Sequence, residues 1–390
     1  MLSRRQLLIA SGYSGLSSLL GAANKSYAQA QLVRENRVIF DEGLDWVTET
    51  GAHNLCARIK RAGFNVLVVC VWHGRGTRWP SSIAPWDNDR LEALALRTPS
   101  FDPLATLLRV AEQYELEVHA WFTVMLLDRP FLPEFYGDIQ DEAFDVHREQ
   151  FRDFISRVIS ECVSRYPIHG VNLDYIRSMV VSTSPHCVQD YKKTTGRNLL
   201  LDRLSYGIGT EARNAIARWN ARAVGEIVQR VSQAARAANP AIVLSVSGHP
   251  GHPGVYLQGQ DSLKWANDGL IDVIFAMHYE PEPDWVEIQA QQRLLRRPES
   301  LVVLCGNYDK VGQNGTVVSR SAKQVSELLK RARILNPKNG VALYLSKMLD
   351  DSQVTALGED VFRVSAKTHW VRGVSVGSSA PSLPSGLKTQ

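Results

Sequence analysis

The chain has 390 residues, of which 22% are charged, and its formal net charge is +4. This length allows one large domain or two. The near balance of 44 basic and 40 acidic residues argues against nucleic acid as a partner, because nucleic-acid-binding proteins usually carry a basic excess on one face.

The first thirty residues have the pattern of an export signal. Ser3-Arg4-Arg5-Gln6-Leu7-Leu8 is a twin-arginine pattern, and a moderately apolar run leads to the small-x-small cleavage site Ala28-Gln29-Ala30. We therefore expect residues 1–30 to be a twin-arginine-type signal peptide of a bacterial protein that is periplasmic or secreted. The segment carries three basic residues and no acid, so its removal lowers the net charge from +4 to +1. Beyond it, no stretch approaches the ~20 apolar residues of a membrane-spanning helix, so we expect no integral membrane segment after signal removal.

Apolar runs of strand length then alternate with helical patterns along the chain. Most of the runs are continuous, as in parallel strands that are buried on both faces. They lie at residues 37–40, 66–72, 117–124, 170–174, 242–247, 271–277, 301–305 and 341–345. Eight such repeats predict an α/β fold, a (β/α)8 TIM barrel, over residues 31–372. The alternative is an open doubly wound sheet, but no Gly-x-Gly-x-x-Gly follows the first strands.

The predicted connections after strands two, three and four are long, at residues 74–99, 126–146 and 178–215. Loops of this size at the carboxyl face of a barrel usually build the substrate cleft, so we expect enlarged βα loops there. Residues 373–390 are rich in Ser, Gly and Pro and indicate a flexible tail.

The five cysteines show no Cys-x-x-Cys spacing. Four of them lie in apolar-periodic segments and are expected to be buried as small hydrophobic side chains. One disulfide remains open, but the sequence does not identify a pair. We expect no metal and no cofactor, and the oligomeric state is left open.

Aromatic, acidic and imidazole side chains gather where the predicted strands end. Sugar rings have apolar faces that stack on aromatic rings and hydroxyl groups that bind charged acceptors, so this composition is typical of a carbohydrate cleft. Cleavage of a glycosidic bond needs two carboxyl groups, and Asp174 and Glu280 are the predicted catalytic pair. The predicted substrate-binding residues are Trp72, His73, Trp121, Tyr175, Arg177, His249, His278, Tyr279, Asn307 and Asp309.

Simpler structural roles compete with several of these assignments. Asp174 could cap a helix or form a turn, and Glu280 could be a solvated loop acid. Trp72 and Trp121 could be core aromatics of the barrel as readily as stacking platforms. If Glu280 lies outside the cleft, Asp309 or a strand-one acid such as Glu42 is the next partner to test.

Four segments together resemble the glycosyl-hydrolase-like family 10 barrels, and the likeness covers roughly residues 36–350. The matching segments are Gly170-Val171-Asn172-Leu173-Asp174-Tyr175-Ile176-Arg177, Glu117-Val118-His119-Ala120-Trp121, Tyr191-Lys192-Lys193-Thr194-Thr195-Gly196, and Trp265 to Asp272 with Met277-His278-Tyr279. The resemblance implies a TIM barrel that acts on bacterial envelope glycans, such as peptidoglycan strands stripped of peptides or poly-N-acetylglucosamine.

The sequence thus predicts an exported glycoside hydrolase whose partner is an amino-sugar-containing envelope polysaccharide. A 2-acetamido sugar could supply its own acetamido oxygen as nucleophile, with Asp174 polarising it. One alternative is a catalytically silent glycan-binding barrel. A less favoured one is a metal-dependent polysaccharide deacetylase using Asp174, His249 and His278, which lack a compact His-x-x-x-His spacing.

Overall fold

A computed structural model describes residues 33–127, 131–136, 138–139, 143–205, 210–312 and 314–372. The predicted signal peptide, residues 1–30, and the predicted tail, residues 373–390, lie outside the described residues. Within the described ranges, no helix combines the length and apolarity needed to cross a membrane.

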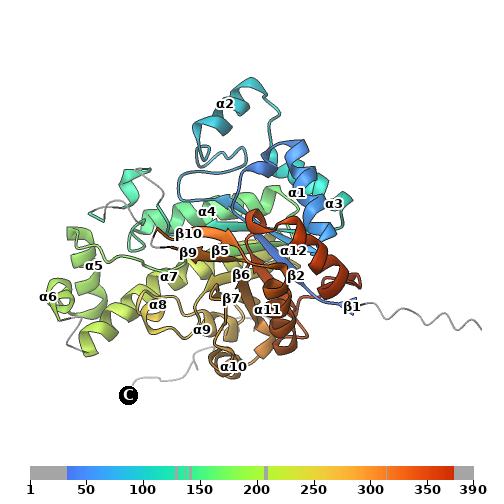
Figure 1. Cartoon of the computed structure of the whole chain (residues 1–390). Coiled ribbons are helices and arrows are strands. Elements are labelled where there is room, and N and C mark those ends of the chain that lie inside the picture. The colour runs from blue at the N-terminus through green and yellow to red at the C-terminus, as the bar shows by residue number, and fades with distance from the viewer. Residues whose placement is uncertain are drawn as a thin grey trace, which may run out of the picture. The chain divides into compact units, whose positions relative to one another are not determined.

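Eight parallel strands close into a barrel, so the predicted TIM barrel is confirmed (Figure 1). Strand β11 pairs with both β2 and β8, which leaves the sheet without an edge. The strands, in chain order, are β2 (Arg37–Asp41), β3 (Val66–Trp72), β4 (Glu117–Thr123), β5 (Gly170–Asp174), β6 (Val243–Gly248), β7 (Val273–His278), β8 (Leu301–Gly306) and β11 (Val341–Tyr344).

Helices alternate with the strands. They are α1 (Glu49–Arg61), α3 (Pro103–Gln113), α4 (Glu149–Arg165), α7 (Thr210–Ala238), α9 (Ser262–Asn267), α10 (Trp285–Arg293), α11 (Ala322–Leu335) and α12 (Asp351–Ala356). Single turns occur at η1 (Asp45–Val47), η2 (Pro133–Phe135), η3 (Pro298–Ser300), η4 (Ser346–Met348) and η5 (Leu357–Val361).

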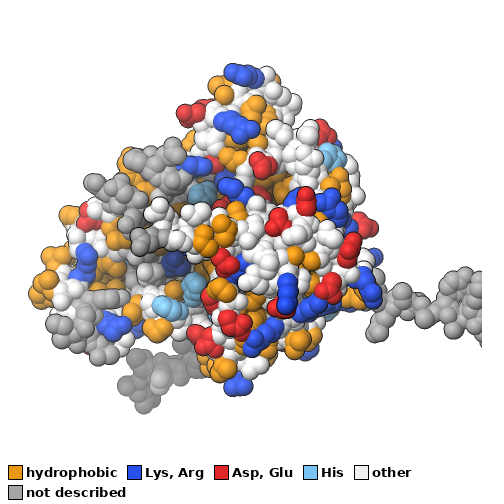
Figure 2. Space-filling view, in the orientation of Figure 1, with side chains coloured by type: hydrophobic (Ala, Val, Ile, Leu, Met, Phe, Trp, Pro, Cys, Tyr) orange, Lys and Arg blue, Asp and Glu red, His pale blue; other side chains and the backbone are white. Residues whose placement is uncertain are grey.

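Lys and Arg are interspersed with Asp and Glu over the face seen in Figure 2.

The enlarged βα loops carry secondary structure of their own. They contain α2 (Asp89–Arg97) after β3, α5 (Pro185–Thr195) and α6 (Leu199–Leu204) after β5, and α8 (Pro253–Leu257) after β6. Figure 1 shows α2, α5 and α6 projecting away from the barrel. The hairpin of β9 (Tyr308–Val311) and β10 (Thr316–Ser319) follows β8, and β1 (Val33–Arg34) pairs with β12 (Ala366–Lys367).

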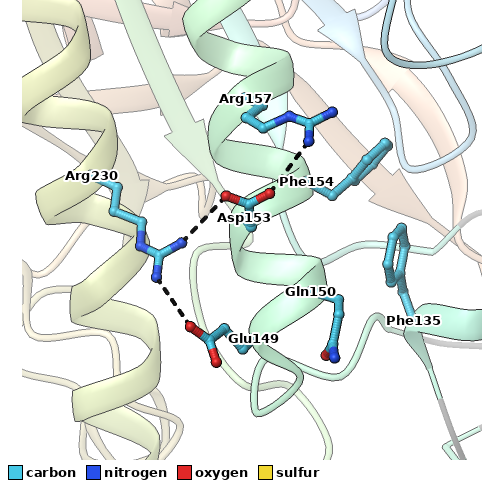
Figure 3. Close-up of a pocket in the computed structure, with 7 residues that line it drawn as sticks. All are labelled: Phe135, Glu149, Gln150, Asp153, Phe154, Arg157 and Arg230. Carbon is cyan, nitrogen blue, oxygen red and sulfur yellow. Dashed lines mark ion pairs between the residues drawn. The ribbon is translucent and has the colours of Figure 1, made fainter.

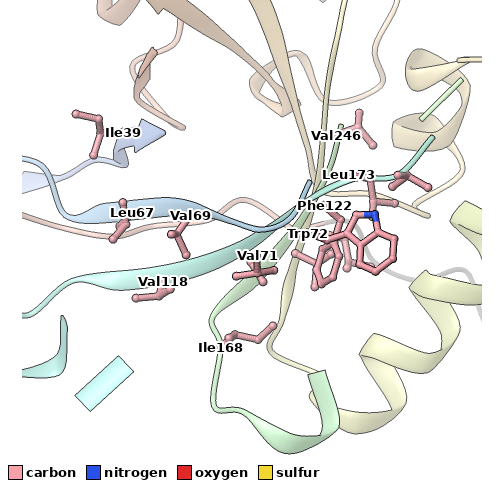
Figure 4. Close-up of a cluster of buried hydrophobic side chains, with 14 of the residues drawn as sticks. Ile39, Leu67, Val69, Val71, Trp72, Val118, Phe122, Ile168, Leu173 and Val246 are labelled. Carbon is pink, nitrogen blue, oxygen red and sulfur yellow. The ribbon is translucent and has the colours of Figure 1, made fainter. Parts of the chain in front are cut away.

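The hydrophobic core has two layers because side chains alternate along each strand. On β3, Val66, Val68 and Cys70 point into the barrel, whereas Leu67 and Val69 pack outward against the helices (Figure 4). All five cysteines are buried and free of disulfides, so burial is confirmed for the four that were expected to be small apolar side chains, and Cys187 is buried as well.

Trp72 does not follow this alternation. The register between β3 and β4 shifts between Cys70 and Trp72, and a bulge of this kind turns the next side chain to the other face. Trp72 therefore joins the outer layer, where it is fully buried against Phe131 and Phe154, each with ring centroids 6.0 Å away. The expectation that Trp72 stacks on a sugar ring is wrong.

Replacement of Trp72 should therefore affect folding rather than glycan binding. We expect Trp72→Ala to lower the free energy of unfolding by about 3–5 kcal/mol, because it leaves a large cavity among aromatic rings. Urea denaturation measures this loss, and Trp72→Phe is the control that should retain most of the stability. Unchanged stability of Trp72→Ala together with weaker glycan binding would contradict the core role.

Candidate active site

Asp174 is the carboxylate at the centre of the site. It ends β5, the residue is 6% exposed, and the backbone N–H of Tyr175 donates to its Oδ1 at 2.7 Å. Tyr175 has φ +48°, a left-handed conformation that is costly for a residue with a side chain. This local strain is the cost of aiming the N–H at the carboxyl group and thereby fixing its orientation.

The surroundings of Asp174 favour its protonated form. Burial raises the pKa of this carboxyl from 3.8 to about 6, and the charge of Glu42 raises it as well. The Tyr175 N–H, the charge of Arg177 and the indole of Trp121 act in the opposite direction but only partly offset burial. A carboxyl group with a pKa near 6 can hold a proton near neutral pH and donate it to a leaving group.

Glu42 is a second carboxylate at the same end of the barrel. It follows β2 directly, and its Oε2 accepts a hydrogen bond of 2.7 Å from the Tyr344 hydroxyl. Burial raises the pKa of the Tyr344 phenol, and the charges of Glu42 and Asp174 both raise it further. The charges of Glu42 and Asp174 therefore both reach Tyr344. The candidate site thus contains two carboxyl groups.

Glu280, the predicted partner of Asp174, lies in the loop after β7. Its side chain is 47% exposed and its Oε1 lies 2.8 Å from His278 Nδ1. Burial lowers the pKa of His249, the charges of Arg177 and His278 lower it further, and the charge of Glu280 offsets this only in part. Glu280 thus belongs to a group of charges at the ends of β6 and β7, and its catalytic role stays a prediction.

Tyrosine rings form an aromatic wall at the mouth of the barrel. Tyr279 and Tyr344 stack with centroids 4.9 Å apart, and Tyr308 lies 6.1 Å from Tyr279 and 6.0 Å from Tyr344. Burial raises the pKa of Tyr279, and the charge of Asp174 raises it further, so this wall lies near the buried acid. Tyr308 and Tyr344 were not among the predicted site residues, although each ends or follows an apolar strand run.

The remaining predicted residues divide between the site and its support. Arg177 lies with its guanidinium 5.2 Å from the centroid of the Tyr175 ring, and His73 follows β3 with part of its surface exposed. Trp121 is 4% exposed inside the barrel, where it contacts Phe40 and Tyr344. It therefore supports the site from within, and the expectation that its ring stacks on a sugar is wrong.

Asn307 and Asp309 hold loops in place. Asn307 is fully buried, and its amide group binds the backbone of Leu345 in both directions, at 3.1 and 2.6 Å. The prediction that Asn307 binds substrate is therefore wrong. Asp309 accepts from Arg320 Nε at 2.7 Å, and Arg320 also donates to the carbonyl of Tyr279 at 2.6 Å, so this pair positions the tyrosine wall.

A separate cavity of about 630 Å³ lies between α4 and α7 (Figure 3). Its charges neutralise one another, since Arg230 lies 3.8 Å from Asp153 and 4.0 Å from Glu149, and Arg157 lies 3.5 Å from Asp153. None of the predicted site residues lines it. Among the described residues, no group of three or more His, Cys, Asp or Glu side chains is arranged to hold a metal ion.

Comparisons with known proteins agree with this architecture. The family model described as "Glycosyl hydrolase-like 10" matches residues 38–135 and 137–297. Glycosyl hydrolase DigH of Escherichia coli K12 is 23% identical over 265 residues, covering 57% of this chain and 56% of that protein. Glycosyl hydrolase YngK of Bacillus subtilis is 24% identical over 252 residues, covering 56% of this chain and 46% of that protein. The chain thus spans about half the length of these curated relatives.

Among solved structures, the PgaB (BpsB) glycoside hydrolase domain from Bordetella bronchiseptica superimposes with a TM-score of 0.62 at 12% identity. The match covers 86% of this chain and 99% of that domain. At this identity the similarity establishes the common barrel fold.

The raised pKa of Asp174 predicts a pH-dependent stability. The folded state binds a proton between pH 3.8 and about 6 that the unfolded state has already released, so the wild type loses stability as pH rises through this window. Asp174→Asn lacks this loss, and its stability relative to the wild type should rise by about 2–3 kcal/mol between pH 4 and pH 7. Denaturant unfolding at both pH values measures the difference. A difference that is the same at both would contradict the assignment.

Proposed function

The chain belongs to the glycosyl hydrolase-like 10 family, and from this premise we propose that it is an exported glycoside hydrolase of an amino-sugar-containing envelope polysaccharide. The observation that carries the proposal is the buried carboxyl of Asp174, whose pKa of about 6 suits a general acid. A second carboxylate and a wall of tyrosine rings, both near Asp174, supply the other parts that a glycosidase needs.

In this mechanism Asp174 donates its proton to the glycosidic oxygen as the bond to the leaving sugar breaks. The strained backbone at Tyr175 holds the carboxyl in position, and burial keeps it protonated up to about pH 6. Arg177, close to Asp174, would stabilise the carboxylate that remains after proton transfer.

We assign the second carboxylate to Glu42 in preference to Glu280. Glu42 is oriented by the Tyr344 hydroxyl and acts on the pKa of Asp174, whereas Glu280 is half exposed and paired with His278. In the two-carboxylate scheme, Glu42 either attacks the anomeric carbon or activates a water molecule. With a 2-acetamido sugar, the acetamido oxygen of the substrate takes the role of nucleophile and a carboxylate polarises it.

The substrate class rests on the family resemblance and on the wall formed by Tyr279, Tyr308 and Tyr344. Rings at the mouth of the barrel offer apolar faces on which pyranose rings stack, and their hydroxyl groups can bind acetamido or hydroxyl groups. Peptide-free peptidoglycan strands and poly-N-acetylglucosamine both consist of pyranose rings that carry acetamido groups. Both polymers should therefore be tested first as substrates.

The test is release of reducing ends from this panel of polymers. Asp174→Asn should lower the rate at least about 100-fold, as loss of a positioned acid does, with the fold intact. Glu42→Gln should cause a loss of similar order and Glu280→Gln a smaller one. Asp351→Asn, an exposed acid on α12 that pairs with Arg58, is the matched control and should retain full activity.

Three results would contradict the hydrolase or part of it. Glycan binding without reducing ends would indicate the silent binding barrel. Release of acetate that stops in chelator would indicate the deacetylase. A larger loss for Glu280→Gln than for Glu42→Gln would return the second catalytic role to Glu280.

Export is proposed from the N-terminal pattern alone. The double variant Arg4→Lys with Arg5→Lys should accumulate as cytoplasmic precursor, because twin-arginine transport reads this pair. Immunoblotting of cell fractions measures the distribution, and N-terminal sequencing of the exported wild type should begin near Gln31. Normal export of the double variant would rule this route out.

A further inference from the structure

A second pocket lies at the carboxyl face of the barrel and is lined in part by Leu44, in the same loop as Glu42. It has a volume of about 560 Å³, and its walls come from the loops that follow β2, β3 and β4. Its apolar walls are Leu44, Trp86 and Phe131, and polar groups of Arg75, Asn88 and Asp89 line it as well. Since all three loops leave the carboxyl ends of their strands, the pocket opens on the same face as the candidate active site.

A buried ion-pair network ties this pocket to the active site. Arg78 donates to the carbonyl oxygens of Glu42 at 3.0 Å and of Gly43 at 2.9 Å, and its Nε donates to Asp87 Oδ2 at 2.9 Å. Asp87 is itself buried in the pocket wall and forms a second ion pair with Arg75. Arg78 therefore connects the pocket wall, through Asp87, to the backbone of Glu42 and Gly43.

Trp86 is held in place before any ligand binds. Its ring packs on Phe101 with centroids 5.5 Å apart. Its backbone lies so close to Gly76 that a Cβ there would be 2.5 Å from the Trp86 carbonyl oxygen. The Thr77 N–H donates to the Pro85 carbonyl at 2.9 Å, and the Asp87 N–H donates to the Thr77 carbonyl at 2.9 Å. These hydrogen bonds hold the backbone on both sides of Trp86. A partly exposed ring fixed in this way loses little entropy when a ligand stacks on it.

We propose that this pocket is a distal subsite that binds a pyranose ring of the glycan chain, with Trp86 and Phe131 as apolar surfaces and Arg75 and Asn88 as polar partners. A sugar ring presents apolar C–H faces and equatorial hydroxyl groups, which match these walls and this rim. Asn88 Oδ1 already accepts from the Leu91 N–H at 3.0 Å, so the Nδ2 amide group of Asn88 is the one that would donate to a ligand oxygen. This inference rests on the proposed function. It adds that the bound glycan extends from the active site toward the loop that carries Glu42.

A subsite of this kind makes the enzyme sensitive to chain length. Trp86→Ala should lower kcat/KM for long glycan chains by about tenfold, in line with the loss of one buried aromatic contact. It should leave kcat/KM for the shortest cleaved oligosaccharide within about twofold, because that substrate does not reach the pocket. Trp86→Tyr, which keeps an aromatic face, should restore most of the activity on long chains.

The matched control is Leu96→Ala, which changes an 81% exposed apolar side chain on α2 outside the pocket and should alter neither rate. Binding of long and short N-acetylglucosamine oligomers to Asp174→Asn, with and without Trp86→Ala, gives a readout that needs no turnover. The long oligomer should bind about tenfold more weakly to the double variant than to Asp174→Asn alone. The short oligomer should bind to both proteins with the same affinity.

The outcomes separate the subsite from the hydrolase. Hydrolysis with equal effects of Trp86→Ala on long and short chains overturns the subsite and leaves the proposed function standing. Trp86-dependent binding of long chains without hydrolysis supports the subsite and overturns the hydrolase. Absence of both hydrolysis and glycan binding by the folded wild type overturns both.

Discussion

Burial of one carboxyl group, that of Asp174, is the constraint on which the candidate active site depends. A carboxylate with so little contact with water is costly, so the acid shifts toward its protonated form. Hydrogen-bonded polar side chains also occur earlier on the same strand, inside the barrel. Asn172, two residues earlier on β5, donates to Ser245 at 3.0 Å and accepts from Ser247 at 3.0 Å. The strained backbone of Tyr175 then gives the carboxyl an orienting N–H.

Arginines fasten the loops around this acid to the ends of the strands. Arg78, after β3, binds the backbone that carries Glu42, and Arg320, after β10, binds the carbonyl of Tyr279. Each of these guanidinium groups is almost fully buried and paired with an acid, Asp87 or Asp309. Removing one partner of a buried pair is strongly destabilising, so these links should keep both carboxylates and the tyrosine wall in fixed positions. Preorganisation of this kind lets a polar site act without rearranging during the reaction.

Several residues of the candidate site were predictable from the sequence, and others were not, for identifiable reasons. Asp174, Tyr175 and Arg177 were recognisable because an apolar run ends in them, and the carboxyl end of a barrel strand is where side chains meet the substrate. Trp72 also ends an apolar run, but a bulge in β3 turns it outward into the core. Asn307 looked equally suitable, yet the backbone of Leu345 occupies its amide group. Neither a bulge nor a hydrogen-bond partner that is distant in the sequence can be predicted from the local pattern of residue types.

By itself, the sequence determined the eight strands, the barrel and the long loops, because continuous apolar runs and helical periodicity are local properties of the chain. Only the tertiary structure decided which side chains share the site with Asp174. Glu42 follows the first strand of the barrel and Tyr344 ends the last one, and they meet because β11 pairs with β2. The pocket beside Glu42 likewise needs three separate loops. Closure of the sheet brings together residues that are 302 positions apart in the sequence, and no local pattern of residues encodes that contact.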